Sequence, residues 1–196
     1  MAPELAGKRL ELLQQAVPTA RRVGAIWNAG DQAMAREYGK TLVAAETLGI
    51  ELQNLGVRTR DELAGAYQTA AEARLDGVVL IHDPLITESH DLLVELSTRS
   101  GMPMISGDAG FVAAGVLMSY GPSLARQAQR AAYFVDRILR GAKPADLPVE
   151  QPMLFDLVVN LKTAQALGIT FPNEILLQFT DVVHRAAALS AALRPS

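Results

Sequence analysis

Polar residues directly follow four apolar segments of this sequence, and their side chains are the ones best suited to chemistry. Trp27-Asn28, His82-Asp83 and Gly107-Asp108 each come after such a segment, and Tyr120 closes another. A flat aromatic ring can stack on a solute, an amide can donate and accept hydrogen bonds, and a carboxylate can bind an ammonium group. This set suits a small zwitterion, so we take as candidate ligand-binding residues Trp27, Asn28, His82, Asp83, Gly107, Asp108 and Tyr120.

Each of these residues also has a purely structural explanation. Asn28 and Asp31 fit a turn that caps the next helix, a position where aspartate is strongly favoured. Asp83-Pro84 is equally a turn signal, and the same turn chemistry applies to Asp108. A single tryptophan more often packs in a core than offers a stacking surface. Gly107 before Asp108 permits an unusual backbone angle or a close approach.

Signatures of catalysis, of cofactor binding and of metal binding are absent from the sequence. It has no glycine-rich dinucleotide or phosphate loop, no Gly-x-Ser-x-Gly and no His-Glu-x-x-His. His82, His90 and His184 do not have the spacing of metal ligands, and the absence of cysteine excludes thiolate sites and disulfides. We expect no cofactor and no metal. An α/β enzyme that uses Asp83 or Asp108 as acid or base is an alternative without motif support.

Composition places the 196-residue chain among ordinary globular proteins, with 49% hydrophobic and 20% charged residues. The net charge is −3 and there is no long basic run, so nucleic acid is not an expected partner. No apolar stretch approaches the roughly 20 residues of a membrane-spanning helix. The first residues lack the apolar segment of a secretory signal, which predicts a cytoplasmic protein if the sequence is complete.

Segments typical of strands and of helices alternate along the chain. The pattern predicts strands at 22–27, 50–57, 76–83 and 102–106, separated by helices at 31–48, 59–74 and 88–99. Regular alternation of this kind requires right-handed crossovers. The fold class is therefore α/β, with a three-layer, Rossmann-like parallel sheet, and ligands of such sheets bind beyond the carboxyl ends of the strands.

The second half of the sequence predicts further elements. After a turn at 111–115 we expect a strand at 116–120 and a long helix that Gly121-Pro122 opens and Gly141 ends. The proline-rich segment 143–152 reads as an extended connection. The remaining predictions are a last strand at 155–159, helices at 161–167 and 172–178, and an alanine-rich tail that frays at 186–196.

Several stretches together are more specific than any one of them. They are Gly7-Lys-Arg-Leu-Glu-Leu-Leu with Val17-Pro18, Arg22-Val-Gly-Ala-Ile-Trp-Asn28, Gly115-Val-Leu-Met-Ser-Tyr-Gly-Pro122, the segment 138–152, and Phe155-Asp-Leu-Val-Val-Asn-Leu-Lys-Thr-Ala-Gln-Ala-Leu-Gly168. The sequence resembles, from about residue 4 to residue 183, the ABC-transporter substrate-binding proteins of the tryptophan/tyrosine-binding type. These proteins have the type I periplasmic-binding-protein fold.

The resemblance implies that this chain is the second lobe of such a protein together with crossover elements of the first lobe. Residues 4–114 would form the second-lobe core and 115–152 a crossover strand, helix and connector that pack on the first lobe. Residues 153–183 would return to the second lobe, and 184–196 would be a tail. The signal peptide and most of the first lobe would then be missing.

The resemblance also implies a function. The protein would bind a small solute, such as an amino acid, and deliver it to an ABC permease from the periplasm or the cell surface. The pair Gly107-Asp108 corresponds to a Gly-acid pair that faces the ligand in the family. The turn at His82-Asp83-Pro84 departs from the Thr-Asp-Asn type of amino-acid-binding relatives, so the identity of the solute stays open. The alternative class is an intracellular sensor module.

Two physical expectations follow from a single lobe. Because receptors of this type close two lobes over a solute, one lobe provides only part of the contact surface and should bind weakly. The apolar stripe of the helix at 122–140, which includes Leu124, Val135 and Ile138, should favour self-association or a loosely docked helix.

Overall fold

The structure, a computed structural model, describes residues 3–150 and 154–184. These residues build one seven-stranded sheet in the order β2-β1-β3-β4-β5-β6-β7. Strands β1 to β5 are parallel, β6 runs antiparallel to β5, and β7 is parallel to β6. The strands are β1 (Arg22–Asn28), β2 (Glu51–Val57), β3 (Gly77–Leu80), β4 (Met104–Ser106), β5 (Met118–Pro122), β6 (Phe155–Asn160) and β7 (Asp181–Val183).

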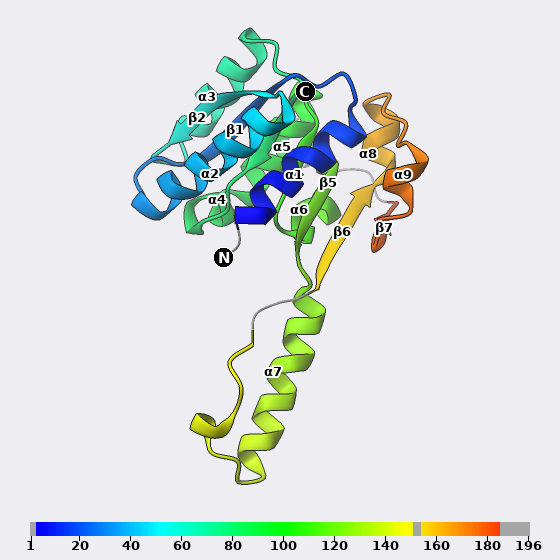
Figure 1. The fold of residues 1–196 in the computed structure, drawn as a ribbon. Coiled ribbons are helices and arrows are strands. Elements are labelled where there is room, and N and C mark those ends of the chain that lie inside the picture. Colours follow the sequence, from blue (N-terminus) through cyan, green and yellow to red (C-terminus); the bar gives the residue numbers. More distant parts are fainter. Residues whose placement is uncertain (1–2, 151–153, 185–196) are drawn as a thin grey trace, which may run out of the picture.

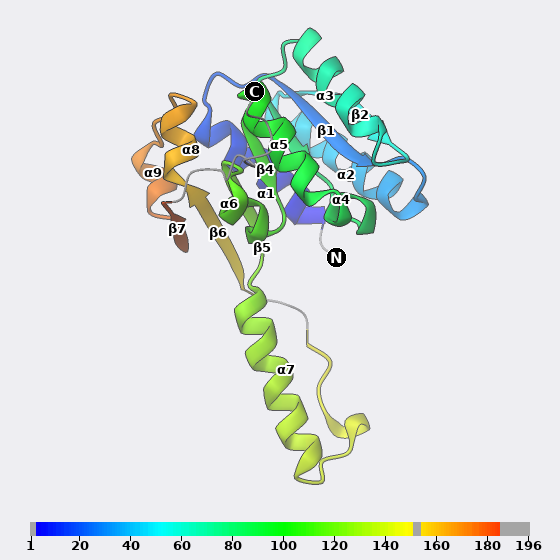
Figure 2. The ribbon, with the colours of Figure 1, turned by 180° about the vertical axis from the view of Figure 1, so that it is seen from behind.

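Helices cover both faces of this sheet, which gives the three layers predicted from the sequence (Figures 1 and 2). One face carries α1, α2, α8 and α9, and the other carries α3, α4, α5 and α6. The helices are α1 (Pro3–Ala16), α2 (Gln32–Leu48), α3 (Glu62–Glu72), α4 (Pro84–Glu88), α5 (His90–Ser100), α6 (Ala109–Ala114), α7 (Leu124–Leu139), α8 (Leu161–Ala166) and α9 (Asn173–Leu176).

The central strands are apolar on both sides because each face of the sheet has its own core. In β3, Val79 packs into the core under α1 and α2, whereas Val78 and Leu80 pack into the core under α3 and α5. In β1, Ala25 and Ile26 divide between the two cores in the same way. A strand buried on both faces must be apolar at consecutive positions. The continuous apolar runs that marked these strands in the sequence thus have their cause in the layering.

Aspartates begin three of the helices that follow parallel strands. The side chains of Asp31, Asp83 and Asp108 accept hydrogen bonds from backbone N–H groups at the start of α2, α4 and α6. Such caps satisfy donors that the helix itself leaves unpaired. The sequence prediction that Asp31 caps the helix of residues 31–48 is confirmed.

Several predicted boundaries differ from the structure. The helix predicted at 88–99 is preceded by the separate short helix α4, and residues 109–114 form α6 where we expected a turn. Pro122 ends β5 instead of opening α7, because its antiparallel pairing with Phe155 keeps the chain extended to that point. The strand at 155–159 is not the last, since β7 follows it. The tail predicted at 186–196 lies outside the described residues.

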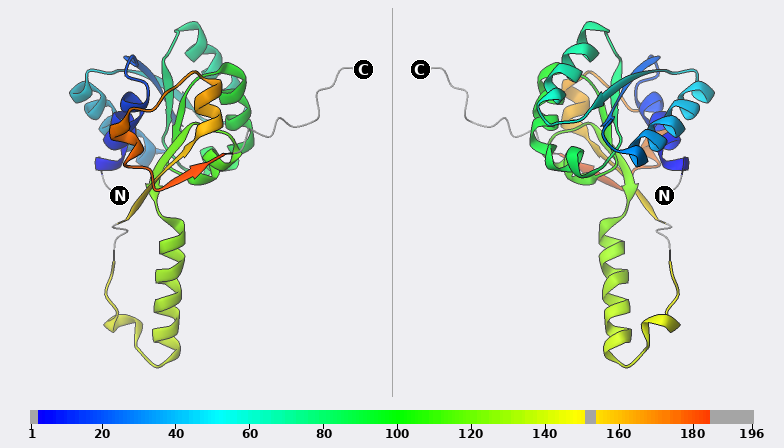
Figure 3. Two further views of the ribbon diagram at one scale, coloured as in Figure 1. Left: turned by 90° about the vertical axis from the view of Figure 1, so that its right-hand side faces the viewer. Right: turned by 90° about the vertical axis from the view of Figure 1, so that its left-hand side faces the viewer.

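Helix α7 projects away from the sheet (Figures 1 and 3). Together with the segment that follows it, up to residue 150, it is called the arm below. None of its residues is buried, and its apolar side chains are open to solvent, with Leu124 exposed to 66% and Leu139 to 82%. The following segment turns at Pro144–Asp146 and runs back along the helix, where Glu150 pairs with Arg130. Within the described part of the chain, no helix is both long and apolar enough to cross a membrane.

Candidate functional site

The carboxyl ends of β1, β3 and β4 meet at one edge of the sheet, on the side from which α7 projects (Figure 1). There Asn28 Nδ2, at the last residue of β1, donates a hydrogen bond of 2.6 Å to Asp83 Oδ2, which follows β3. The other oxygen of that carboxylate accepts from the N–H of Ile86 and caps α4. The contact shows that the structure brings together residues that lie 55 positions apart in the sequence.

A second set of hydrogen bonds joins the ends of β3 and β4. His82 Nε2 accepts a hydrogen bond of 3.0 Å from the N–H of Gly107 and lies 2.9 Å from Ser106 Oγ. Ser106 Oγ in turn accepts from the N–H of Asp108 and donates to its carbonyl oxygen. This network fixes the backbone of the Gly107-Asp108 turn. Ser106, which the sequence reading did not single out, is the residue that connects it.

The imidazole of His82 is held in its neutral form. Burial lowers the pKa of His82 to about 4, and the positive charge of Arg9 acts in the same direction. A neutral ring fits the hydrogen bonds, because Nε2 can accept from Gly107 only when it carries no proton. The proton of the neutral ring is therefore on Nδ1. His82 serves this edge as a structural acceptor rather than as a cation.

Two candidates of the sequence reading face the core instead of the edge. Trp27 is only 7% exposed, its ring stacks on Tyr38 at a centroid distance of 5.0 Å, and its Nε1–H donates to Asn54 Oδ1. Tyr120 lies half-buried beside the same core, with its ring 5.7 Å from that of Phe155. Consecutive residues of a strand point to opposite faces, so a position near the strand end did not by itself bring either ring to the edge.

The backbone of Gly107 has no unusual angle, since its φ is not positive, and its lack of a side chain matters because Arg9 fills the adjacent space. A Cβ atom there would lie 2.5 Å from a terminal guanidinium nitrogen of Arg9 and 3.2 Å from the ring of His82. A Cβ atom on Gly121 in β5 would lie 1.9 Å from the carbonyl oxygen of Gly107. The two glycines let the backbones of β4 and β5 and the Arg9 side chain pack together at this edge.

Arg9, like Ser106, is a residue of this site that the sequence analysis missed. It comes from α1, and its Nε donates a hydrogen bond of 2.8 Å to the carbonyl oxygen of Tyr120. A signal was available, because Arg9 interrupts the apolar face that Leu5, Leu12 and Leu13 form on this helix. A charged residue in such a stripe needs a polar partner at the sheet.

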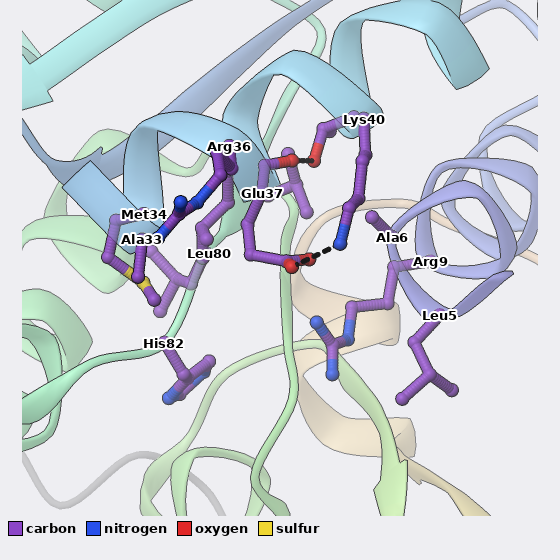
Figure 4. Close-up of a pocket in the computed structure, with 13 residues that line it drawn as sticks. Leu5, Ala6, Arg9, Ala33, Met34, Arg36, Glu37, Lys40, Leu80 and His82 are labelled. Atoms are coloured by element: carbon purple, nitrogen blue, oxygen red, sulfur yellow. Dashed lines mark hydrogen bonds and ion pairs between the residues drawn. The ribbon is translucent and has the colours of Figure 1, made fainter. Parts of the chain in front are cut away.

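Two hollows open on either side of His82, which lines both. The first, of about 400 Å³, lies between α1, α2 and the end of β3, and Figure 4 shows Arg9, Glu37, Lys40 and His82 around it. The second, of about 390 Å³, lies at the ends of β4 and β5 and the start of α7, and Asp108 lines it. Among the described residues, no group of three or more His, Asp or Glu side chains could hold a metal ion.

Comparison with known proteins adds relatives of this architecture. A "Tyrosine-binding protein" of Clostridioides difficile is 23% identical over 160 residues, which are 82% of this chain and 46% of that protein. A Streptococcus pneumoniae ABC domain solved in complex with L-Trp is 25% identical, with a TM-score of 0.77 over 91% of this chain and 62% of that one. An open, ligand-free substrate binding protein with adhesive properties from Clostridium difficile is 22% identical, with a TM-score of 0.69.

The match to the last of these proteins covers 91% of this chain and 59% of that protein. This chain therefore spans less than two thirds of the length of each of the three relatives. These structures share its mostly parallel, helix-flanked sheet, which is that of type I periplasmic binding proteins. The model of the ABC transporter substrate binding proteins, a family of binding proteins and not of enzymes, matches residues 3–183. The chain therefore belongs to the family of ABC transporter substrate-binding proteins.

Proposed function

We propose that this chain is the second lobe of a solute-binding protein and that it holds an amino acid or a similar small molecule at the carboxyl edge of its sheet. The observation that carries the proposal is the convergence of three strand ends, where Asn28, His82-Asp83 and Gly107-Asp108 come together. Open α/β sheets bind ligands at this edge. The ligands named for the relatives, tyrosine and tryptophan, support an amino acid as the solute.

Within this edge, Asp108 is the residue we assign to the ammonium group of the solute. Its Oδ1 accepts from the N–H of Gly110 at 2.8 Å, while the side chain lines the second hollow. A carboxylate that is partly satisfied by a helix cap still offers lone pairs to an ammonium donor. Asn28 and Asp83 bond to each other and shape the rim.

The arm supports the proposed division into lobes. In this division residues 4–114 and 153–183 form the second lobe, and 115–152 carry both β5, which pairs within the same sheet, and the helix that packs on the first lobe. The exposed apolar side chains of α7 need a cover, and α7 leaves the sheet on the same side as the candidate site (Figure 3). A first lobe placed there would cover the arm and close over the solute. Delivery to an ABC permease outside the cytoplasm completes the proposal.

An NMR titration of the ¹⁵N-labelled chain with L-tyrosine, L-tryptophan and L-leucine tests the proposal. We expect weak, saturable shifts confined to the amides of Asn28, His82-Asp83 and 107–109, because one lobe supplies only part of the contacts. Shifts spread over other parts of the sheet, or none at saturation of the amino acids, would contradict the site. Tight stoichiometric binding by this chain would contradict the need for the first lobe.

The substitution Asp108→Asn should weaken the binding of an amino acid by about tenfold, because it removes a charge-assisted hydrogen bond and keeps a capping side chain. Asp31→Asn is the matched control, since Asp31 caps α2 in the same way and lines neither hollow. Equal loss of amino-acid binding in the two variants would show that Asp108 acts only by capping its helix and not by contacting the solute.

A further inference from the structure

The guanidinium group of Arg9 lies in an unusual position for a cation. It reaches from α1 between the helix and the ends of β4 and β5, where one terminal nitrogen occupies the space that a side chain on Gly107 would fill. Burial is the main cause that lowers the pKa of Arg9. An arginine nevertheless stays charged in a protein, so a positive charge is kept at the floor of the first hollow.

This charge has no ion-pair partner within 4 Å among the residues that the structure describes. Glu37 of α2 is the carboxylate whose charge acts on Arg9, and that carboxylate is engaged by Lys40 at 2.6 Å (Figure 4). With Arg36 on the rim, the hollow holds three cationic side chains against one carboxylate. A partly buried cation without a counter-ion is costly, which makes the hollow receptive to an anion.

The remaining donors of Arg9 define the kind of anion. Its Nε–H is used by the carbonyl oxygen of Tyr120, which fixes the plane of the group and leaves the N–H groups of the two terminal nitrogens. Such a planar fork matches the two oxygens of a carboxylate. The other walls of the hollow are apolar and come from Leu5, Met34 and Leu80. An anion that fits has a carboxylate head and a small apolar body.

We propose that the first hollow is a carboxylate-binding subsite in which Arg9 holds the acid group of a small organic acid. The proposal rests on the proposed function, since it assigns the acidic end of the solute to one side of His82 and the ammonium group to the Asp108 side. Gly107 is a positioning residue here, because a Cβ atom at this position would displace the guanidinium from the space that it fills. Neutral analogues of the same shape should be rejected.

The test compares 3-phenylpropanoate with 3-phenylpropanamide on the wild-type chain at pH 7, with the ¹⁵Nε–Hε resonance of Arg9 as the readout. We expect the acid to shift this resonance saturably and to bind about tenfold more tightly than the amide. This comparison needs no variant, so it does not depend on whether an altered chain folds. Equal binding of acid and amide would overturn the subsite.

Variants distinguish specific binding of the carboxylate by Arg9 from nonspecific attraction by the positive charge of the hollow. Arg9→Gln should lower the affinity for the acid about tenfold, and Arg9→Lys should give an intermediate loss because it keeps the charge without the fork. Arg36→Gln, the matched control on the exposed rim, should change it by about twofold or less. An equal loss in Arg36→Gln and Arg9→Gln would overturn the assignment to Arg9.

The outcome also distinguishes the two proposals. Amino acids that shift the amides of Asn28 and Asp108 with no response of Arg9 would leave the proposed function standing and refute the subsite. Binding of 3-phenylpropanoate at Arg9 without any effect of amino acids at Asp108 would do the reverse.

Discussion

Helices α1 and α7 have similar lengths, 14 and 16 residues, and each carries an apolar stripe, yet they differ completely in what that stripe meets. In α1, Leu10 and Leu13 are fully buried against the sheet and α2. In α7, Val135 and Leu139 are exposed to 55% and 82%. The same kind of sequence pattern thus gives a core helix in one place and an open surface in the other.

The difference shows that an amphipathic pattern indicates that one face of a helix must be buried, but not which part of the structure buries it. Helix α1 packs on strands of the sheet, among them β3, β4 and β5. Among the described residues, none provides α7 with a comparable apolar surface. The ion pair that joins α7 to the segment running back along it, between Arg130 and Glu150, is exposed. Stability should therefore come from the sheet and the helices packed on it, called the body below. The arm should contribute little to it. The following predictions test that contrast.

The largest difference is expected between two truncations of leucine. Leu13→Ala should lower the free energy of unfolding by about 2–5 kcal/mol, because it leaves a cavity in the core. Leu124→Ala on the exposed face of α7 should change it by less than about 0.5 kcal/mol. Urea denaturation followed by circular dichroism measures both, and a comparable loss in the two variants would refute the contrast.

The root of the arm should behave like the body. Gly121→Ala should destabilise the chain by about 3 kcal/mol, since its Cβ atom would collide with the backbone carbonyl of Gly107. Gly39→Ala in the middle of α2 meets no neighbouring atom and should stabilise the chain by up to about 1 kcal/mol. Chemical denaturation of both variants provides the check. A tolerated Gly121→Ala would mean that β4 and β5 are further apart than described.

Acid sensitivity should arise in the body as well. The pKa of His82 is lowered from its ordinary 6.5 to about 4 in the folded chain, so the unfolded chain binds the proton more readily between these values. Stability is therefore full above pH 6.5 and falls as the pH drops toward 4, by at most about 3 kcal/mol from this residue. Unfolding measured from pH 7 to 4 should show a shallower decline in His82→Gln, and parallel declines would contradict the assignment.

The smallest energetic effect concerns the surface of α7. We expect weak self-association that the substitution Val135→Glu reduces, and rapid amide exchange through 124–139 compared with α1. Analytical ultracentrifugation over a range of concentrations and hydrogen exchange provide the readouts. A strictly monomeric chain with slow exchange through α7 would show that the arm is stabilised in another way.

The layered α/β fold could be predicted because β1 and β3 are buried on both faces, which requires apolar residues at consecutive positions. The parallel direction of the first strands and most helices followed from the same pattern, whereas the antiparallel direction of β6 was not predicted. The short elements β7 and α6 were not predicted, since three to six residues carry too little periodicity. The strand character of Gly121-Pro122 depends on pairing with β6, and this partner lies more than thirty residues away in the chain.

The candidate site was predictable where the backbone alone decides it. Positions that follow parallel strands must share an edge, which is why Asn28 and Asp83 meet. Side-chain direction was the harder part, and it sends Trp27 to the core. Arg9 was out of reach for a rule that looks only at strand ends, because it enters the edge from a neighbouring helix. Its interruption of an apolar stripe is the signal to look for.

The antiparallel pairing of β5 with β6 has a topological consequence. Pro122 faces Phe155 across adjacent strands, so everything between them is an insertion into a β-hairpin whose two ends lie one strand spacing apart, about 5 Å. A short tight turn could join these ends directly. The whole arm could then be excised by protein engineering, leaving a smaller α/β domain that keeps its sheet order but loses the α7 wall of the second hollow.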